Sequence, residues 1–110
     1  MRDGMYHVIF SSAQGAGEGL AVFKGESVNG GDDGYLYTGP KTQKGDAFKS
    51  TLTIKKWKQD AQSIFGNVQQ FTLNLEGRDS PGGGFEASGH VVGQPDARIS
   101  IRGRFLSELA

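Results

Sequence analysis

The chain has 110 residues, no cysteine and equal numbers of basic and acidic side chains, 12 of each. This length makes one domain, residues 1–110, large enough to fold around a single core. The lack of cysteine excludes disulfides, thiolate metal sites and a cysteine nucleophile, and the balanced charge disfavours nucleic acid and anionic membranes as partners.

The first residues have the pattern of a strand and lack the features of a targeting segment. Residues 1–10 contain no apolar core of signal-peptide length and no small-residue cleavage site. No stretch of the chain approaches the roughly 18 apolar residues that a membrane-spanning helix requires. We therefore expect a cytoplasmic protein.

Alternating apolar and polar residues predict about eight strands. In the first of them, Tyr6, Val8 and Phe10 share one face while Met5 and Ile9 lie on the other. The expected strands lie, in chain order, at residues 4–12, 18–25, 27–29, 34–39, 46–57, 71–78, 85–91 and 98–105.

The connections are predicted from glycine, proline and polar residues. We expect loops at residues 11–17, 39–45 and 79–84. Asp33-Gly34 can supply the two positive-φ positions of a type I′ turn. A helical turn is plausible only within residues 59–67, where residues 63–66 would plug one end of the core.

Each expected strand has one apolar face, which predicts an all-β fold, either a barrel or a sandwich. Closure into a small eight-stranded antiparallel up-and-down β-barrel leaves no open edge, and inward glycines such as Gly77, Gly89 and Gly103 suit a narrow interior. We favour the barrel, which can be filled by side chains or hold one small ligand. The expected inner surface consists of Phe10, Leu52, Ile54, Phe71, Leu73, Leu75, Phe85, Ile99, Ile101 and Phe105.

No residue pattern indicates catalysis. His7 and His90 fall on outward faces without other ligands at metal spacing, so we expect no metal site and no cofactor. Asp32-Asp33 is typical of a turn, because the alternating ligands of a calcium loop are missing. No serine, histidine and aspartate can be arranged as a triad, which disfavours an enzyme.

Two outer surfaces are candidates for protein contacts. Arginine is enriched at interfaces, and the last strand presents an outward arginine stripe. Trp57 is either a rim residue that closes the barrel or an exposed anchor. The candidate partner-binding residues are Arg98, Arg102, Arg104 and Trp57. The candidate homodimer surface consists of outward apolar residues in the N-terminal half, Met5, Ile9, Ala21, Phe23 and Leu36.

Several short blocks occur in a specific order: Asp3-Gly4-x-Tyr6, Phe10-x-Ser12, Gly17-Glu18-Gly19, Gly30-Gly31-Asp32, Tyr37-x-Gly39 and Ser63-Ile64-Phe65-Gly66. In this order they resemble the GrlR family, whose type member negatively regulates a type III secretion gene cluster. The resemblance implies a small cytoplasmic β-barrel, similar in shape to lipocalins and fatty-acid-binding proteins. It also implies a dimer that binds a transcriptional activator rather than DNA.

The resemblance places the family's partner site just after the Tyr-x-Gly block, as a surface run of alternating acidic residues. Here that run is Lys41-Thr42-Gln43-Lys44-Gly45-Asp46, which is basic and polar, so no family site residue is carried over. Two functions remain. The first is a non-enzymatic regulator that binds a protein partner, and the alternative is a carrier of a small apolar ligand inside the barrel.

Overall fold

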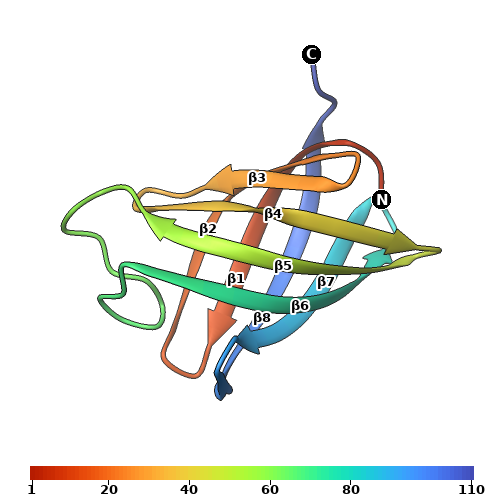
Figure 1. Ribbon diagram of the computed structural model, residues 1–110. Coiled ribbons are helices and arrows are strands. Elements are labelled where there is room, and N and C mark those ends of the chain that lie inside the picture. Colours follow the sequence, from red (N-terminus) through yellow and green to blue (C-terminus); the bar gives the residue numbers. More distant parts are fainter.

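Eight antiparallel strands close into a barrel in the computed structural model, which describes residues 1–110 (Figure 1). Each strand pairs with the next, and β1 pairs with β8 to complete the circuit. The predicted barrel is thereby confirmed over the sandwich. The strands are β1 (Gly4–Ser12), β2 (Gly15–Lys24), β3 (Ser27–Gly31), β4 (Tyr35–Lys44), β5 (Ala47–Lys56), β6 (Gln70–Ser80), β7 (Gly84–Val91) and β8 (Gln94–Ser107).

Aromatic rings fill the end of the barrel near the N-terminus. Phe85 is buried, and its ring centroid lies 5.7 Å from Tyr6, 5.4 Å from Phe23 and 5.6 Å from Phe48. All three contacts are edge-to-face, the arrangement that aromatic quadrupoles favour. These four residues, Tyr6, Phe23, Phe48 and Phe85, are called the aromatic cluster here.

Inward glycines make room for these rings and for close strand approach. A side chain at Gly77 would overlap the Phe48 ring, and one at Gly103 would overlap the Phe85 ring. At Gly89, a Cβ atom would overlap the backbone carbonyl of Asn74 on β6. The three glycines expected to line a narrow interior therefore do so.

The predicted inner surface is largely confirmed. Six of its ten residues are buried, and Phe10, Phe71, Ile101 and Phe105 are partly buried and pack against the core. Phe10 and Phe71 belong to the end of the barrel at which the cavity opens.

The orientation predicted for the second strand was wrong. Ala21 and Phe23 were expected to face outward, yet only 4% and 5% of their surfaces are exposed. Ala21 lies opposite Tyr6 in the β1–β2 ladder, and residues directly opposite each other share a face. Because Tyr6 points inward, Ala21 and Phe23 do so too, and Leu20 takes the outward position.

Two predicted loops are largely strand. β1 ends at Ser12 and β2 begins at Gly15, so only two residues connect them. β4 continues through Pro40 to Lys44, although proline has no N–H to donate to a ladder. The Pro40 carbonyl instead accepts a hydrogen bond from the Ser50 hydroxyl at 2.7 Å, and pairing with β5 resumes at Lys41.

The turn before β4 and the segment before β6 also differ from expectation. No residue other than glycine has positive φ, so Asp33-Gly34 does not form a type I′ turn. Residues 57–69 form no helix, only an isolated bridge between Ser63 and Gly66. Gly66 has a φ angle of +98°, which is incompatible with a right-handed helix at this residue.

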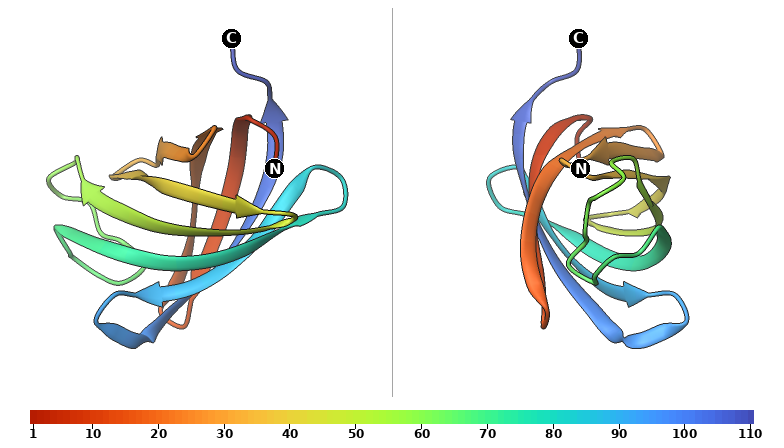
Figure 2. Two further views of the ribbon diagram at one scale, coloured as in Figure 1. Left: turned by 45° about the vertical axis from the view of Figure 1, so that its right-hand side comes forward. Right: turned by 90° about the vertical axis from the view of Figure 1, so that its left-hand side faces the viewer.

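The segment of residues 57–69, called the end loop here, lies across one end of the barrel (Figure 2). Ile64 and Phe65 pack against the core, and the rings of Phe65 and Phe71 are 5.6 Å apart. The Tyr35 hydroxyl donates to the Val68 carbonyl at 2.7 Å and holds the loop in place. The expected plug by residues 63–66 is therefore present, but without a helical turn. The structure contains no helix long and apolar enough to cross a membrane.

Candidate functional site

The barrel interior contains a cavity of about 550 Å³. Its walls are mainly apolar side chains from all parts of the barrel, among them Val8, Phe23, Leu52, Leu73, Phe85 and Ile99. This volume lies within the range of about 300–1,000 Å³ typical of small-molecule sites. Composition left open whether the barrel was filled or hollow, and the structure shows that it is hollow.

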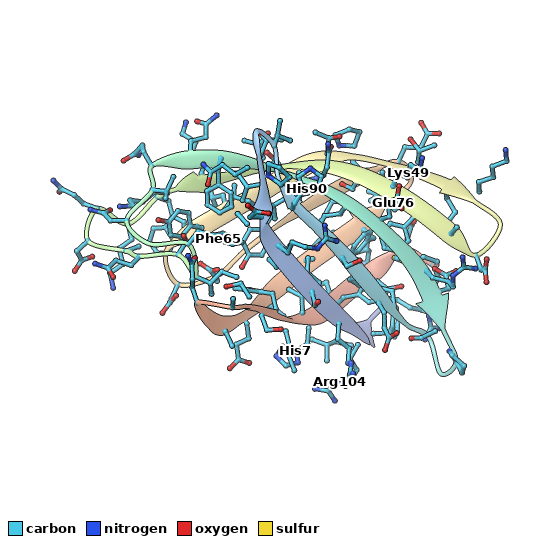
Figure 3. The ribbon with its side chains drawn as sticks, turned by 90° about the horizontal axis from the view of Figure 1, so that it is seen from below. His7, Lys49, Phe65, Glu76, His90 and Arg104 are labelled. Atoms are coloured by element: carbon cyan, nitrogen blue, oxygen red, sulfur yellow. The ribbon has the colours of Figure 1, made fainter.

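The cavity opens at the barrel end that carries the end loop. Gln62, Ser63, Ile64 and Phe65 of that loop line it there, together with Asp33 from the β3–β4 turn. Figure 3 shows Phe65 at this end of the barrel. We call this opening the mouth.

The mouth contains a fixed carboxylate. Asp32 accepts hydrogen bonds at Oδ1 from the backbone N–H groups of Gly34 (2.9 Å) and Tyr35 (2.8 Å). Its Oδ2 accepts a hydrogen bond from the Tyr37 hydroxyl. Burial, and next the hydrogen bond to Asp32, raise the pKa of Tyr37 above its usual range, so the phenol stays neutral and remains a donor.

Glycines that identified the family blocks surround this pair. A Cβ atom at Gly19 would lie 2.6 Å from the Tyr37 hydroxyl, and one at Gly17 would lie 2.7 Å from the Phe10 ring. The Gly-Glu-Gly, Gly-Gly-Asp and Tyr-x-Gly blocks thus meet at the mouth through Gly19, Asp32 and Tyr37. Sequence reasoning treated these residues as turn and strand residues and missed that they meet.

Trp57 joins the end loop to the mouth. Its indole N–H donates to the backbone carbonyl of Asp32 at 3.1 Å. The residue is nevertheless 54% exposed. Both alternatives stated for Trp57 are therefore partly met, because it is a rim residue with an exposed face.

A second hollow, of about 1060 Å³, lies on the outside of the barrel and is called the outer groove here. Mainly outward residues of β1 and of β4 to β8 line it, and the buried Phe48 and Ala87 lie at its floor between them. Three exposed ion pairs lie in or beside it: Lys49–Glu76 (3.8 Å), Arg102–Glu86 (3.8 Å) and Arg78–Asp46 (3.3 Å). The charged residues lining the groove are Lys44, Lys49, Glu76, Arg78, Glu86 and Arg102, four basic and two acidic.

The arginine stripe predicted on β8 is exposed but does not form one site. Arg102 lines the outer groove, whereas Arg98 lies opposite His90 and Arg104 opposite His7 in their ladders. Figure 3 shows Arg104 beside His7, on the opposite side of the view from Lys49 and Glu76. His7 also contacts the Glu18 carboxylate at 2.7 Å.

The run that occupies the family's partner-site position is part strand and part turn. Lys41 points inward, is 4% exposed, and its ammonium lies 5.8 Å from the Phe23 ring centroid. Thr42 and Lys44 face outward and line the outer groove. This position therefore contributes to the groove with a lysine in place of acidic residues.

The candidate dimer residues are divided by their orientation. Met5, Ile9 and Leu36 are 37%, 50% and 45% exposed, as expected, whereas Phe23 is buried in the aromatic cluster and cannot form part of a surface. Leu20, which was not predicted, is 51% exposed. Cross-strand pairing with β1 is the signal that would have identified it.

Comparison with known proteins gives one family. No curated protein matches the chain. The model of the family described as the T3SS negative regulator GrlR matches residues 1–109. The match extends from the β1 strand through the mouth residues to the end of β8, beyond the first two-thirds in which the short blocks were found. With its closed eight-stranded barrel and this match over nearly its whole length, the chain belongs to the GrlR family of negative regulators of type III secretion.

Proposed function

We propose that this chain is a non-enzymatic cytoplasmic regulator that lowers type III secretion gene expression by binding a protein partner at the outer groove. Family membership supports the regulatory role. The observation that carries the binding surface is the groove itself, a hollow of about 1060 Å³ with an excess of basic side chains. The partner that fits it is a transcriptional activator with an acidic surface.

Closure of the barrel also favours side-chain recognition over strand addition. All eight strands pair on both sides over at least part of their length, so only short free edges, such as residues 15–19 of β2, are available to a partner. Arg102 is 78% exposed at its side chain, and its 3.8 Å pair with Glu86 leaves donors free. Arginine in such a position can form bidentate contacts with a carboxylate.

Reversing the charge of Arg102 should therefore disrupt the regulator without unfolding it. Exposed ion pairs contribute about 0–1 kcal/mol, so Arg102→Glu should keep the barrel stable. We expect recovery of the activator with the tagged regulator to fall at least tenfold and repression of a secretion reporter gene to be relieved. Lys24→Glu, the same charge change at an exposed residue outside the groove, is the matched control. Full repression by Arg102→Glu would refute the groove as the partner site.

We further propose a homodimer through the outward apolar residues of β1, β2 and β4. Leu20 and Leu36 both lie opposite Gly31 of β3, so the two leucines flank a residue without a side chain. Met5 extends this surface on β1, whereas Ile9 lies opposite Arg102 and lines the outer groove. With no net charge, little long-range repulsion separates two copies.

Leu20→Glu should convert the dimer to a monomer, because it places a charge within the apolar contact. Light scattering at tens of micromolar is expected to give the mass of two wild-type chains and of one variant chain. Thr51→Glu, on the exposed side of β5, should remain dimeric. A wild-type mass of one chain would end the dimer proposal, and a dimeric Leu20→Glu protein would move the interface elsewhere.

The cavity favours a second candidate function, the carrying of a small apolar ligand. Its walls are apolar and its mouth is covered in part by the end loop, as in sites that shield a ligand from water. Native mass spectrometry of gently purified protein should then show a reproducible non-covalent adduct of low mass. An adduct-free barrel that also fails to bind added apolar compounds would remove this candidate.

A further inference from the structure

The charged residues that line the cavity are all acidic. Three carboxylate residues, Glu18, Asp32 and Asp33, belong to its lining, and no lysine, arginine or histidine does. Glu18 is on the outward face of β2, where it contacts His7. The charges available to an occupant are therefore those of Asp32 and Asp33, both at the mouth.

All hydrogen-bond donors to the Asp32 carboxylate are neutral groups. Its three hydrogen bonds come from two backbone N–H groups and from the Tyr37 phenol. Such bonds stabilise a carboxylate in its ionised form without cancelling its charge. Asp33, next to it in the turn, is exposed and forms no ion pair.

The two inward lysines do not offset these charges inside the cavity. Lys56 lies at the same barrel end, but its ammonium donates to Asn67 of the end loop and it does not line the cavity. Lys41 lies toward the opposite end, where its ammonium donates to Gln43 at 3.3 Å. A ligand carboxylate would thus meet two aspartates at the mouth and no cation of the cavity lining. Lys58, whose backbone N–H donates to the Gly34 carbonyl at 3.4 Å, lies outside the lining.

We propose that the cavity takes a hydrophobic amine, with its apolar body among the inner side chains and its ammonium at Asp32 and Asp33. This proposal rests on the carrier function proposed above and specifies the class of ligand. The ammonium completes a pair with the fixed carboxylate, and the apolar body occupies a volume that water does not favour. A fatty acid of the same length is disfavoured by repulsion from the same two residues.

Three probes with the same alkyl chain test this selectivity: decylamine, decanol and decanoate, each below its critical micelle concentration. At pH 7 the amine is protonated and the acid is ionised. Isothermal titration calorimetry should show decylamine binding at least tenfold more tightly than decanoate, with decanol between them. Raising the salt concentration should weaken binding of the amine and leave decanol unchanged.

Two variants locate the charge that matters. Asp33→Asn should reduce the amine-over-alcohol preference severalfold while decanol affinity stays constant. Asp32→Asn should do the same, with its amide oxygen still able to accept the turn hydrogen bonds. If Asp32→Asn fails to fold, Asp33→Asn and the salt dependence decide alone. Asp96→Asn, an exposed carboxylate outside the lining, should change nothing.

The outcomes separate the two proposals. If decanoate binds as tightly as decylamine, or more tightly, the amine selectivity is wrong and the carrier function stands. If none of the three probes binds, the carrier function itself fails and the selectivity fails with it.

Discussion

Replacing Phe85 with alanine is expected to lower the free energy of unfolding by about 3–5 kcal/mol. Phe85 is 3% exposed and contacts three other rings of the aromatic cluster. The variant loses the transfer energy of a large ring and leaves a void, because Gly103 beneath the ring has no side chain to fill it. The neighbouring strands are tied into a closed ladder and can collapse only slightly.

Urea unfolding followed by far-ultraviolet circular dichroism measures this loss. Phe71→Ala is the matched control, since both phenylalanines line the cavity but Phe71 is only partly buried. Its ring has one near neighbour, Phe65 at 5.6 Å, and a more distant one, Tyr35 at 6.3 Å. Its loss should be clearly smaller. Equal losses for the two variants would mean that full burial and three ring contacts do not make Phe85 more important to stability than Phe71.

Gly89→Val should destabilise the barrel by about 3 kcal/mol, the upper end of the usual cost of overpacking. The reason is that the new Cβ atom would overlap the Asn74 carbonyl, a backbone atom that cannot rotate away. Relief requires β6 and β7 to separate at the Leu75–Gly89 pair. Ser88→Val changes the adjacent outward residue and should cost less than about 1 kcal/mol.

The same urea measurement applies to both glycine and serine variants. In addition, hydrogen exchange should show faster exchange of β6 and β7 amides in Gly89→Val than in the wild type. Wild-type stability in Gly89→Val would show that the two strands can separate there without cost.

Most of the fold could be predicted from the sequence, because most strands contain a clear period of two. β5 is typical: Phe48, Leu52 and Ile54 alternate with exposed lysines and threonines, and all three are buried. β2 was misoriented since both of its faces are apolar, with Leu20 and Val22 on one and Ala21 and Phe23 on the other. Only its pairing with β1 decides between the faces, and pairing is not visible in one strand.

The structure of the irregular segments could not be predicted for a different reason. Pro40 within Gly-Pro predicts a break, but β4 continues past it, and pairing with β5 resumes at Lys41. The Pro40 carbonyl accepts a hydrogen bond from the Ser50 hydroxyl of β5. The end loop is held by Tyr35 and Trp57, whose partners lie 33 and 25 residues away in the chain. Such distant contacts leave no local pattern.

The candidate sites were the least predictable part. The mouth joins Gly19 of β2 to Asp32 before β4 and Tyr37 within it, and each residue alone has an ordinary structural explanation. The charged residues of the outer groove come from five strands, and the arginine stripe on β8 contributes only Arg102. Both sites depend on the curvature of the sheet. The alternation of apolar and polar residues along each strand does not predict this curvature.

The pairing of β1 with β8 has a consequence for synthesis in the cell. One side of β1 has no partner until β8 has been made, because every hydrogen bond on that side comes from residues 100–107. Until β8 has been made, the nascent chain therefore carries β1 with one edge unpaired, exposed to other chains and to chaperones. Closure of the barrel must wait until β8 has been made, and a pause or truncation before β8 leaves an open sheet with an exposed edge.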